Sequence, residues 1–353
     1  MWRTRGHEGA LERLKRALAG GSTTHAYLLT GPARVGKATL ARELAMALNC
    51  TAWQGEARPS LFDAVGEISA GEPAPCYQCP SCLKVLAGAH PDVMIVEQWV
   101  AARTPIIDQV RAIQYASGLL PYEGRWKVYV LLNAEDLTLP AQNALLKTLE
   151  EPAETVRLIL TAPSAQSLLP TVVSRCQQIA LRPVGRNDIA AALRELREVE
   201  EERSRFLATV ANGRLGWALE AAGDDALLQA REAAFGQLRR ALYGDTAERF
   251  RIAEELAAQA ASRPEATIDV LQLWLGWLRD LLLLLEGCGD LIGGVDQSEA
   301  LTAAAEELDS RAAQSCIQAL QRAIAQTQSS TNTRLALEVL MLRLPSLRAA
   351  AFS

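Results

Sequence analysis

Residues 26–39 read AYLLTGPARVGKAT and predict a strand, a tight turn and a helix in immediate succession. Residues 26–30 form a short apolar run, which is typical of a buried strand, and residues 37–48 have helical character. Gly31 and Gly36 let the backbone turn so that its N–H groups point at phosphate oxygens, and the start of the helix adds positive potential. This order of elements is the context that a phosphate-binding loop, or P-loop, requires.

The loop matches the P-loop pattern incompletely. The candidate nucleotide-binding residues are Gly31, Arg34, Gly36, Lys37, Ala38 and Thr39. Lys37 would reach the outer phosphates, but the pattern places Ser or Thr directly after it as a magnesium ligand. Ala38 stands at that position, and Thr39 is rotated from it by about 100° on a helix. We therefore expect no Mg²⁺ site, and the loop leaves binding of ATP or ADP open.

A second magnesium contact is also missing. ATPases with this loop carry an acid at the end of a neighbouring strand. The strand predicted over residues 126–132 is followed by Asn133 and Ala134, and Glu135 and Asp136 come later. These acids could take the role out of register, but we expect them to form a turn and cap the next segment.

Strands and helices alternate through the first half of the chain. Strands are predicted at residues 26–30, 93–96, 126–132 and 156–161, and helices at 8–19, 37–48, 106–119 and 141–150. This alternation predicts an α/β domain with a parallel sheet covered by helices on both faces. Beyond about residue 180 the signal is helical, at 189–196, 248–261, 268–285 and 312–325. We expect an α/β domain over 1–182, a small helical domain over 183–225 and a helical bundle over 226–353.

Composition limits the classes of function. The 353 residues include 49% hydrophobic and 22% charged side chains, with a net charge of −5, so strong DNA binding by the chain alone is not expected. The most apolar stretch, Val270–Leu285, is interrupted by Gln272, Arg279 and Asp280 and is too short to span a bilayer comfortably. We predict a buried helix there, no membrane association and, without a targeting signal at the N-terminus, a cytoplasmic protein.

Four of the seven cysteines are candidate metal ligands: Cys50, Cys76, Cys79 and Cys82. The two-residue spacings let thiolates converge on one tetrahedral Zn²⁺, and four thiolates leave no open position for catalysis. The alternative is four buried thiols that pack as small apolar groups. We predict a structural zinc site, with an irregular connection over residues 51–75 between Cys50 and Cys76.

Further motifs indicate a family. Residues 89–92 read AHPD, residues 143–152 read NALLKTLEEP, and residues 174–176 read SRC. Together with the P-loop and the cysteine cluster, they resemble the clamp-loader subunits of bacterial DNA polymerase III, which belong to the AAA+ family. The resemblance covers roughly residues 6–220, and the last hundred residues match mainly in helical character and in residues 332–338. It implies that the helical domain over 183–225 is the lid of an AAA+ module and that the final bundle is a collar in a hetero-pentameric ring.

Two types of subunit share these motifs. The gamma/tau motor keeps the full phosphate loop, an acidic pair after the strand and a sensor arginine. This chain has instead Ala38, the pair Leu132-Asn133 and, where the sensor would align, Gly216. These departures resemble the delta-prime subunit, which implies little ATP hydrolysis of its own. The resemblance also implies that Arg175 is catalytic in trans, at the ATP of a neighbouring gamma/tau subunit. The implied partners are gamma/tau, delta, the sliding clamp and primer-template DNA.

Two alternatives remain open at this point. The first is a gamma/tau-type motor that hydrolyses ATP itself. The second is a zinc-containing AAA+ relative that acts as a DNA-binding or adaptor protein outside replication. Hydrolysis by the isolated chain would favour the first, and salt-sensitive binding of primed DNA by the isolated chain would favour the second.

Overall fold

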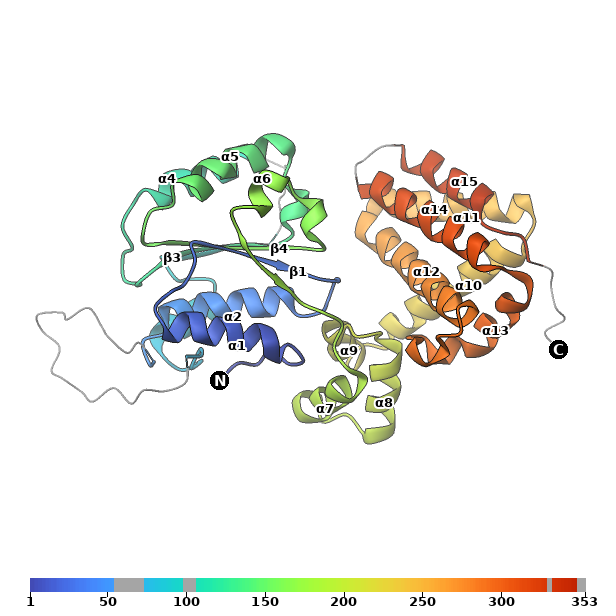
Figure 1. Cartoon of the computed structure of the whole chain (residues 1–353), viewed down its shortest axis with the longest axis horizontal. Helices are drawn as coiled ribbons and strands as arrows, with labels where there is room; N and C mark the ends of the chain where they lie inside the picture. Colours follow the sequence, from blue (N-terminus) through green and yellow to red (C-terminus); the bar gives the residue numbers. More distant parts are fainter. Residues whose placement is uncertain (54–72, 98–105, 329–331, 348–353) are drawn as a thin grey trace, which may run out of the picture. The chain divides into compact units, whose positions relative to one another are not determined.

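The computed structural model describes residues 1–53, 73–97, 106–328 and 332–347 (Figure 1). Most of the connection predicted over residues 51–75 lies outside them. The chain forms two compact units: Met1–Ala192 with Gly213–Trp217, and Leu193–Asn212 with Ala218–Ser353. The division into three domains at residues 182 and 225 stays a prediction.

The first unit is built on a parallel five-stranded sheet with the order β2-β3-β4-β1-β5. Its strands are β1 (Ala26–Thr30), β2 (Val93–Val96), β3 (Lys127–Leu131), β4 (Val156–Ala162) and β5 (Gln177–Ala180). β1 lies between β4 and β5, in a register that places Tyr27 beside Ile159. All five residues of β1 are buried, as expected for a strand covered on both faces. The predicted parallel-sheet domain with a phosphate loop, followed by a mostly helical region, is confirmed.

Helices cover both faces of this sheet. α1 (Glu8–Ala19) and α2 (Lys37–Asn49) lie on one face, and α4 (Ile106–Ser117), α5 (Leu139–Glu150) and α6 (Pro170–Val173) lie on the other (Figure 1). The short α3 (Pro80–Leu86) contacts α2. α1 buries Leu11, Leu14 and Leu18, which recur at helical spacing. The core below α4 and α5 contains fully buried side chains such as Leu145.

Two differences from the sequence-based expectation have local causes. The helix predicted over residues 106–119 ends at Ser117, because Gly118 follows it and breaks the helix. β5 was not predicted. Only Ile179 is buried among its four residues, so this edge strand lacks the apolar run that marks β1.

The second unit is helical in its described part. It contains α8 (Glu201–Val210), α10 (Ala226–Tyr243), α11 (Thr246–Ser262), α12 (Pro264–Leu285), α13 (Ser298–Glu307), α14 (Ser310–Gln328) and α15 (Thr333–Arg343). The boundary between the units runs through α7 (Arg186–Arg197) and α9 (Leu215–Ala221). α12 contains the apolar stretch from Val270 and packs against α14, α13, α11 and α10. Trp274, at its centre, is fully buried and donates to Ala234 O at 2.8 Å. The prediction of a buried helix here is confirmed, and no helix among the described residues is long and apolar enough to cross a membrane.

Candidate functional site

The phosphate loop connects the central strand β1 to α2, and its backbone requires glycine. Gly31 and Gly36 have φ values of +148° and +113°, a region that side chains with a Cβ rarely adopt. A Cβ on Gly31 would also lie 2.4 Å from the carbonyl oxygen of Leu181. The loop therefore has the P-loop position and the P-loop backbone predicted from the sequence.

Lys37 interacts with the loop itself. Its Nζ atom donates to Gly31 O at 2.6 Å and to Pro32 O at 2.8 Å. Burial lowers the pKa of this amine to about 8, and the charge of Glu135 partly offsets that effect. The lysine that would reach the outer phosphates is thus hydrogen-bonded to two carbonyl groups of its own chain.

Two further contacts hold the middle of the phosphate loop, at the carbonyl groups of Arg34 and Val35. The His7 ring nitrogen Nε2 lies 2.9 Å from Val35 O. The backbone N–H of Gly216 donates to Arg34 O at 2.8 Å, and a Cβ on Gly216 would lie 2.9 Å from the same oxygen. Arg34 itself has a left-handed backbone with φ of +59°. The first turn of α9 therefore packs directly on the loop through a residue without a side chain.

The positions expected to hold magnesium carry no oxygen ligand. Ala38 is half-buried at the start of α2, and Thr39 is exposed beside it. Leu132, just after β3, is buried, and its side chain is apolar. Asn133 follows with φ of +51°, and its backbone N–H donates to Thr161 Oγ1 at 3.0 Å.

Glu135 is closer to the phosphate loop than the sequence suggested. Glu135 and Asp136 form a short 3-10 helix, η1 (Ala134–Asp136), as expected for a turn, but the expectation that they cap the next segment is wrong. Thr138 caps α5 instead, by accepting a hydrogen bond from Ala141 N at 3.4 Å. Burial raises the pKa of Glu135 to about 7, and the charge of Lys37 opposes that shift. One Glu135 carboxylate oxygen, Oε2, is buried with no hydrogen-bond partner among the described residues.

The four predicted cysteine ligands converge. Their Sγ atoms all lie within 4.8 Å of one another, and the Cys50–Cys79 and Cys76–Cys82 sulfur pairs are both 4.0 Å apart. Tetrahedral zinc with Zn–S bonds of about 2.3 Å separates its sulfurs by about 3.8 Å, so the spacing fits such an ion. The cluster joins the C-terminus of α2, which Cys50 follows, to the N-terminus of α3, which Cys79 caps.

Backbone N–H groups point at the sulfur atoms of this cluster. Cys79 N donates to Cys76 Sγ at 3.2 Å, and Cys82 N donates to Cys79 Sγ at 3.4 Å. N–H donors directed at sulfur are compatible with metal-bound thiolate ligands. The donor set and its hydrogen bonds are therefore suited to a structural metal ion rather than to a disulfide.

Buried polar groups tie the cysteine cluster to the P-loop helix. Glu43 of α2 is 1% exposed and accepts hydrogen bonds from Arg3 N, from Thr4 N and Oγ1, and from the Tyr77 hydroxyl. Tyr77 lies between the cysteines, and the Arg3 guanidinium lies 3.9 Å from the centre of its ring. The N-terminal segment, α2 and the cysteine loop are thus held by one carboxylate.

The AHPD motif has a structural role in the same region. The His90 ring contacts Ser81 Oγ of α3 at 3.2 Å through Nε2, and its Nδ1 accepts from Asp92 N at 3.1 Å. The Asp92 carboxylate accepts three backbone hydrogen bonds of 2.7–2.8 Å from residues 122–124. Burial acts to raise the pKa of Asp92, but these three bonds outweigh it and the pKa is lowered. The same bonds fix the turn that leads into β3.

Arg175, the predicted catalytic residue, follows α6. Its Nη2 atom forms an ion pair with Glu150 Oε1 at 2.8 Å, and Nη1 donates to Thr171 O at 2.9 Å and to Ser174 Oγ at 3.3 Å. Its side chain remains 36% exposed. Burial raises the pKa of neighbouring Cys176 to about 12, so this residue stays a thiol. Arg175 contacts α5 and α6, whereas the other candidate residues form the loop and the cysteine cluster.

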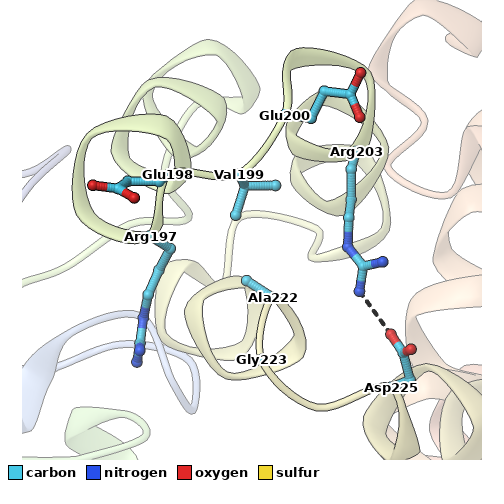
Figure 2. Close-up of a pocket in the computed structure, with 8 residues that line it drawn as sticks. All are labelled: Arg197, Glu198, Val199, Glu200, Arg203, Ala222, Gly223 and Asp225. Atoms are coloured by element: carbon cyan, nitrogen blue, oxygen red, sulfur yellow. Dashed lines mark hydrogen bonds and ion pairs between the residues drawn. The ribbon is translucent and has the colours of Figure 1, made fainter.

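A separate open hollow of about 470 Å³ lies in the second unit, near the end of α7 and the start of α8. Figure 2 shows that the Arg203 side chain extends toward Asp225. Its Nη2 atom lies 2.7 Å from Asp225 Oδ1, which makes an ion pair. Arg197 and Glu198 point away from that pair. No residue of the phosphate loop, the cysteine cluster or the Arg175 region lines this hollow.

The sequence is similar to known replication proteins. The Escherichia coli DNA polymerase III subunit tau is 34% identical over 222 residues, which cover 61% of this chain and 31% of that protein. The Pseudomonas aeruginosa DNA polymerase III subunit delta' is 38% identical over 156 residues, which cover 44% of this chain and 42% of that protein. The chain thus spans less than half the length of each of these two relatives.

A solved structure of a DNA polymerase III gamma subunit-related protein from Thermotoga maritima aligns with 95% of this chain and 98% of its own, with 19% identity and a TM-score of 0.40.

The sequence profile of one family, described as DNA polymerase III, delta subunit, matches residues 6–185. This match includes the phosphate loop, the four cysteines and Arg175. Because it extends over slightly more than half of the chain, the protein belongs to the DNA polymerase III delta-subunit family.

Proposed function

We propose that this chain is the delta-prime, or stator, subunit of a bacterial clamp loader. In this role it hydrolyses little or no ATP and supplies Arg175 to the ATP bound by a neighbouring gamma/tau subunit. The partners are gamma/tau and delta subunits in a hetero-pentameric ring that places a sliding clamp on primer-template DNA. The family match and the similarity to both delta' and tau proteins support a clamp-loader subunit.

The phosphate loop, with its lysine bonded to the loop itself and without magnesium ligands, is the observation that carries the stator assignment. Lys37 is bonded to the carbonyls of Gly31 and Pro32, and Gly216 packs against Arg34 where a motor would carry its sensor arginine. Apolar Ala38 and Leu132 stand where magnesium ligands are needed. Phosphoryl transfer relies on neutralising the phosphate charge, so a site without these groups is poorly suited to it.

The exposure of Arg175 supports its role in trans. A guanidinium placed against the developing phosphate charge accelerates hydrolysis in the manner of an arginine finger. Arg175 is partly exposed and its contacts lie at the ends of α5 and α6, so it can reach a second molecule without unfolding this one.

We also propose that the four cysteines bind one structural Zn²⁺. The ion would fix the cysteine loop to the end of α2, and its four thiolate ligands leave no coordination site for substrate.

The gamma/tau-type motor is the second candidate, and the 34% identity to the E. coli tau subunit favours it. ATP hydrolysis separates the two functions. The rate of ATP hydrolysis is measured for the chain alone. It is then measured for the chain mixed with a gamma/tau motor, delta, sliding clamp and primed DNA. We expect no hydrolysis by the chain alone and stimulated hydrolysis by the mixture.

Arg175→Ala in the mixture tests the trans role. We expect the complex to assemble normally and its ATPase rate to fall at least tenfold. An unchanged rate would remove the arginine from the mechanism. Hydrolysis by the isolated chain that is lost in Lys37→Ala would instead establish the motor.

A further inference from the structure

We propose that Glu150 is a positioning residue, which holds the Arg175 guanidinium in the orientation that serves the neighbouring ATP site. The inference rests on the proposed function, because it assigns a second residue to the same arginine. Its basis is the 2.8 Å ion pair between Glu150 Oε1 and Arg175 Nη2.

The guanidinium is held from two directions. Thr171 O and Ser174 Oγ, from the same helical turn as Arg175, accept from Nη1. Glu150 approaches Nη2 from the last residue of α5. An arginine side chain has several rotatable bonds, and contacts on only one terminal nitrogen would leave the plane of the guanidinium free to swing. The contact from α5 fixes the second nitrogen and therefore the plane.

Buried contacts hold the two helices that position Glu150 and Arg175, α5 and α6. Gln142, in the first turn of α5, is 5% exposed, and its Oε1 accepts from the backbone N–H of Leu169, which precedes α6. Its Nε2 donates to Leu137 O at 3.0 Å. Leu149, next to Glu150, is 2% exposed and belongs to the core below α5. Val172 of α6 belongs to the same buried core cluster, so α5 and α6 are packed together independently of the ion pair.

The Glu150 carboxylate orients the Arg175 guanidinium and contributes little to the folding stability of the chain. Its side chain is 50% exposed, and an ion pair between exposed side chains changes a folding equilibrium by about fivefold at most. A weak pair is still sufficient to bias the rotamers of one side chain. Orientation of a catalytic group acts on the rate of the bound complex, so its loss lowers kcat and leaves the KM for ATP unchanged.

The experiment uses the complete clamp loader, with this chain as wild type, Glu150→Ala, Glu150→Gln, Arg175→Ala and the double variant. The neighbouring exposed acid supplies the matched control, Glu151→Ala. For each complex, kcat and KM for ATP are measured with clamp and primed DNA, and thermal melting of each chain checks its fold. We expect Glu150→Ala to lower kcat three- to fivefold at unchanged KM and an unchanged melting temperature. Glu150→Gln, which keeps an acceptor oxygen, should recover part of the loss, and Glu151→Ala should match wild type.

The double variant decides whether Glu150 acts through Arg175. We expect it to equal Arg175→Ala alone, because a positioning residue has no effect once its target is gone. A further loss in the double variant, or a rise in kcat in Glu150→Ala, would overturn the inference. Normal activity of Glu150→Ala beside an impaired Arg175→Ala would overturn the inference and leave the proposed function intact. Normal activity of Arg175→Ala would overturn both.

Discussion

Gly216 donates its backbone N–H to the carbonyl oxygen of Arg34 at 2.8 Å, and this hydrogen bond joins the first turn of α9 to the middle of the phosphate loop. The approach is close enough that a Cβ on Gly216 would lie 2.9 Å from that oxygen. A side chain at this position, including the sensor arginine that the motor type would carry there, needs the loop or the helix to move.

The first prediction is that Gly216→Ala destabilises the protein. The new methyl group meets a backbone carbonyl, which cannot rotate away as a flexible side chain can, and overpacking of this kind costs roughly 1–3 kcal/mol. Thermal melting and urea titration measure the change. Gly9→Ala is the control, because nothing lies within 4 Å of its added Cβ and alanine favours the helix α1. Equal stability of the two variants would show that the phosphate loop can shift at Arg34 with little cost in folding free energy.

The second prediction concerns pH. Burial raises the pKa of Glu135 to about 7, from an ordinary value near 4.5. Between these values the folded protein binds this proton and the unfolded chain has released it, so stability falls as pH rises from about 4.5 to 7. At about 1.4 kcal/mol per pKa unit, the upper limit of this loss is roughly 3 kcal/mol. Lys37, with a pKa of about 8, titrates above this window.

Glu135→Gln should remove this dependence. We expect the free energy of unfolding of wild type, minus that of the variant, to decrease between pH 5 and pH 7.5. The exposed residue Glu151 supplies the control, Glu151→Gln, which leaves the decrease in place. Parallel curves for wild type and Glu135→Gln would show that the Glu135 carboxyl is ionised normally.

The sequence alone was sufficient to predict the helices and strands whose apolar pattern lies within their own residues. Val93–Val96 and Glu8–Ala19 were predicted with the observed bounds, because each carries its own apolar pattern. The cysteine cluster was also predictable, since metal-ligand spacing is encoded in the chain. The interaction of Glu135 with Lys37, and that of Glu150 with Arg175, join residues far apart in sequence, and only the packing of the sheet and helices brings them together.

The third prediction is that the purified protein contains about one equivalent of zinc per chain. Replacing a ligand by Cys79→Ser should reduce the bound zinc well below one equivalent and lower the melting temperature, because a structural metal contributes directly to folding. Cys288→Ser is the control, since Cys288 is exposed and lies outside the cluster. Elemental analysis after extensive dialysis makes the measurement. A folded wild-type protein without metal would contradict the zinc assignment.

The fourth prediction tests the second unit through Arg249 of α11. This side chain is 9% exposed and donates to Leu344 O at 2.9 Å and to Pro345 O at 2.5 Å, which closes the C-terminal end of α15. Arg249→Ala leaves these carbonyls without that donor and should destabilise the unit by about 2–4 kcal/mol. Arg249→Lys should recover little, because one ammonium group cannot reproduce the two-sided geometry of a guanidinium.

Arg251→Ala is the matched control for Arg249, because Arg251 lies on the same helix with a side chain that is 66% exposed. Urea denaturation followed by circular dichroism measures the helical signal, in which the second unit dominates. We expect the Arg251 variant to remain within about 0.5 kcal/mol of wild type. If Arg249→Ala is equally mild, water replaces the guanidinium at the end of α15 and the arginine is dispensable for the bundle.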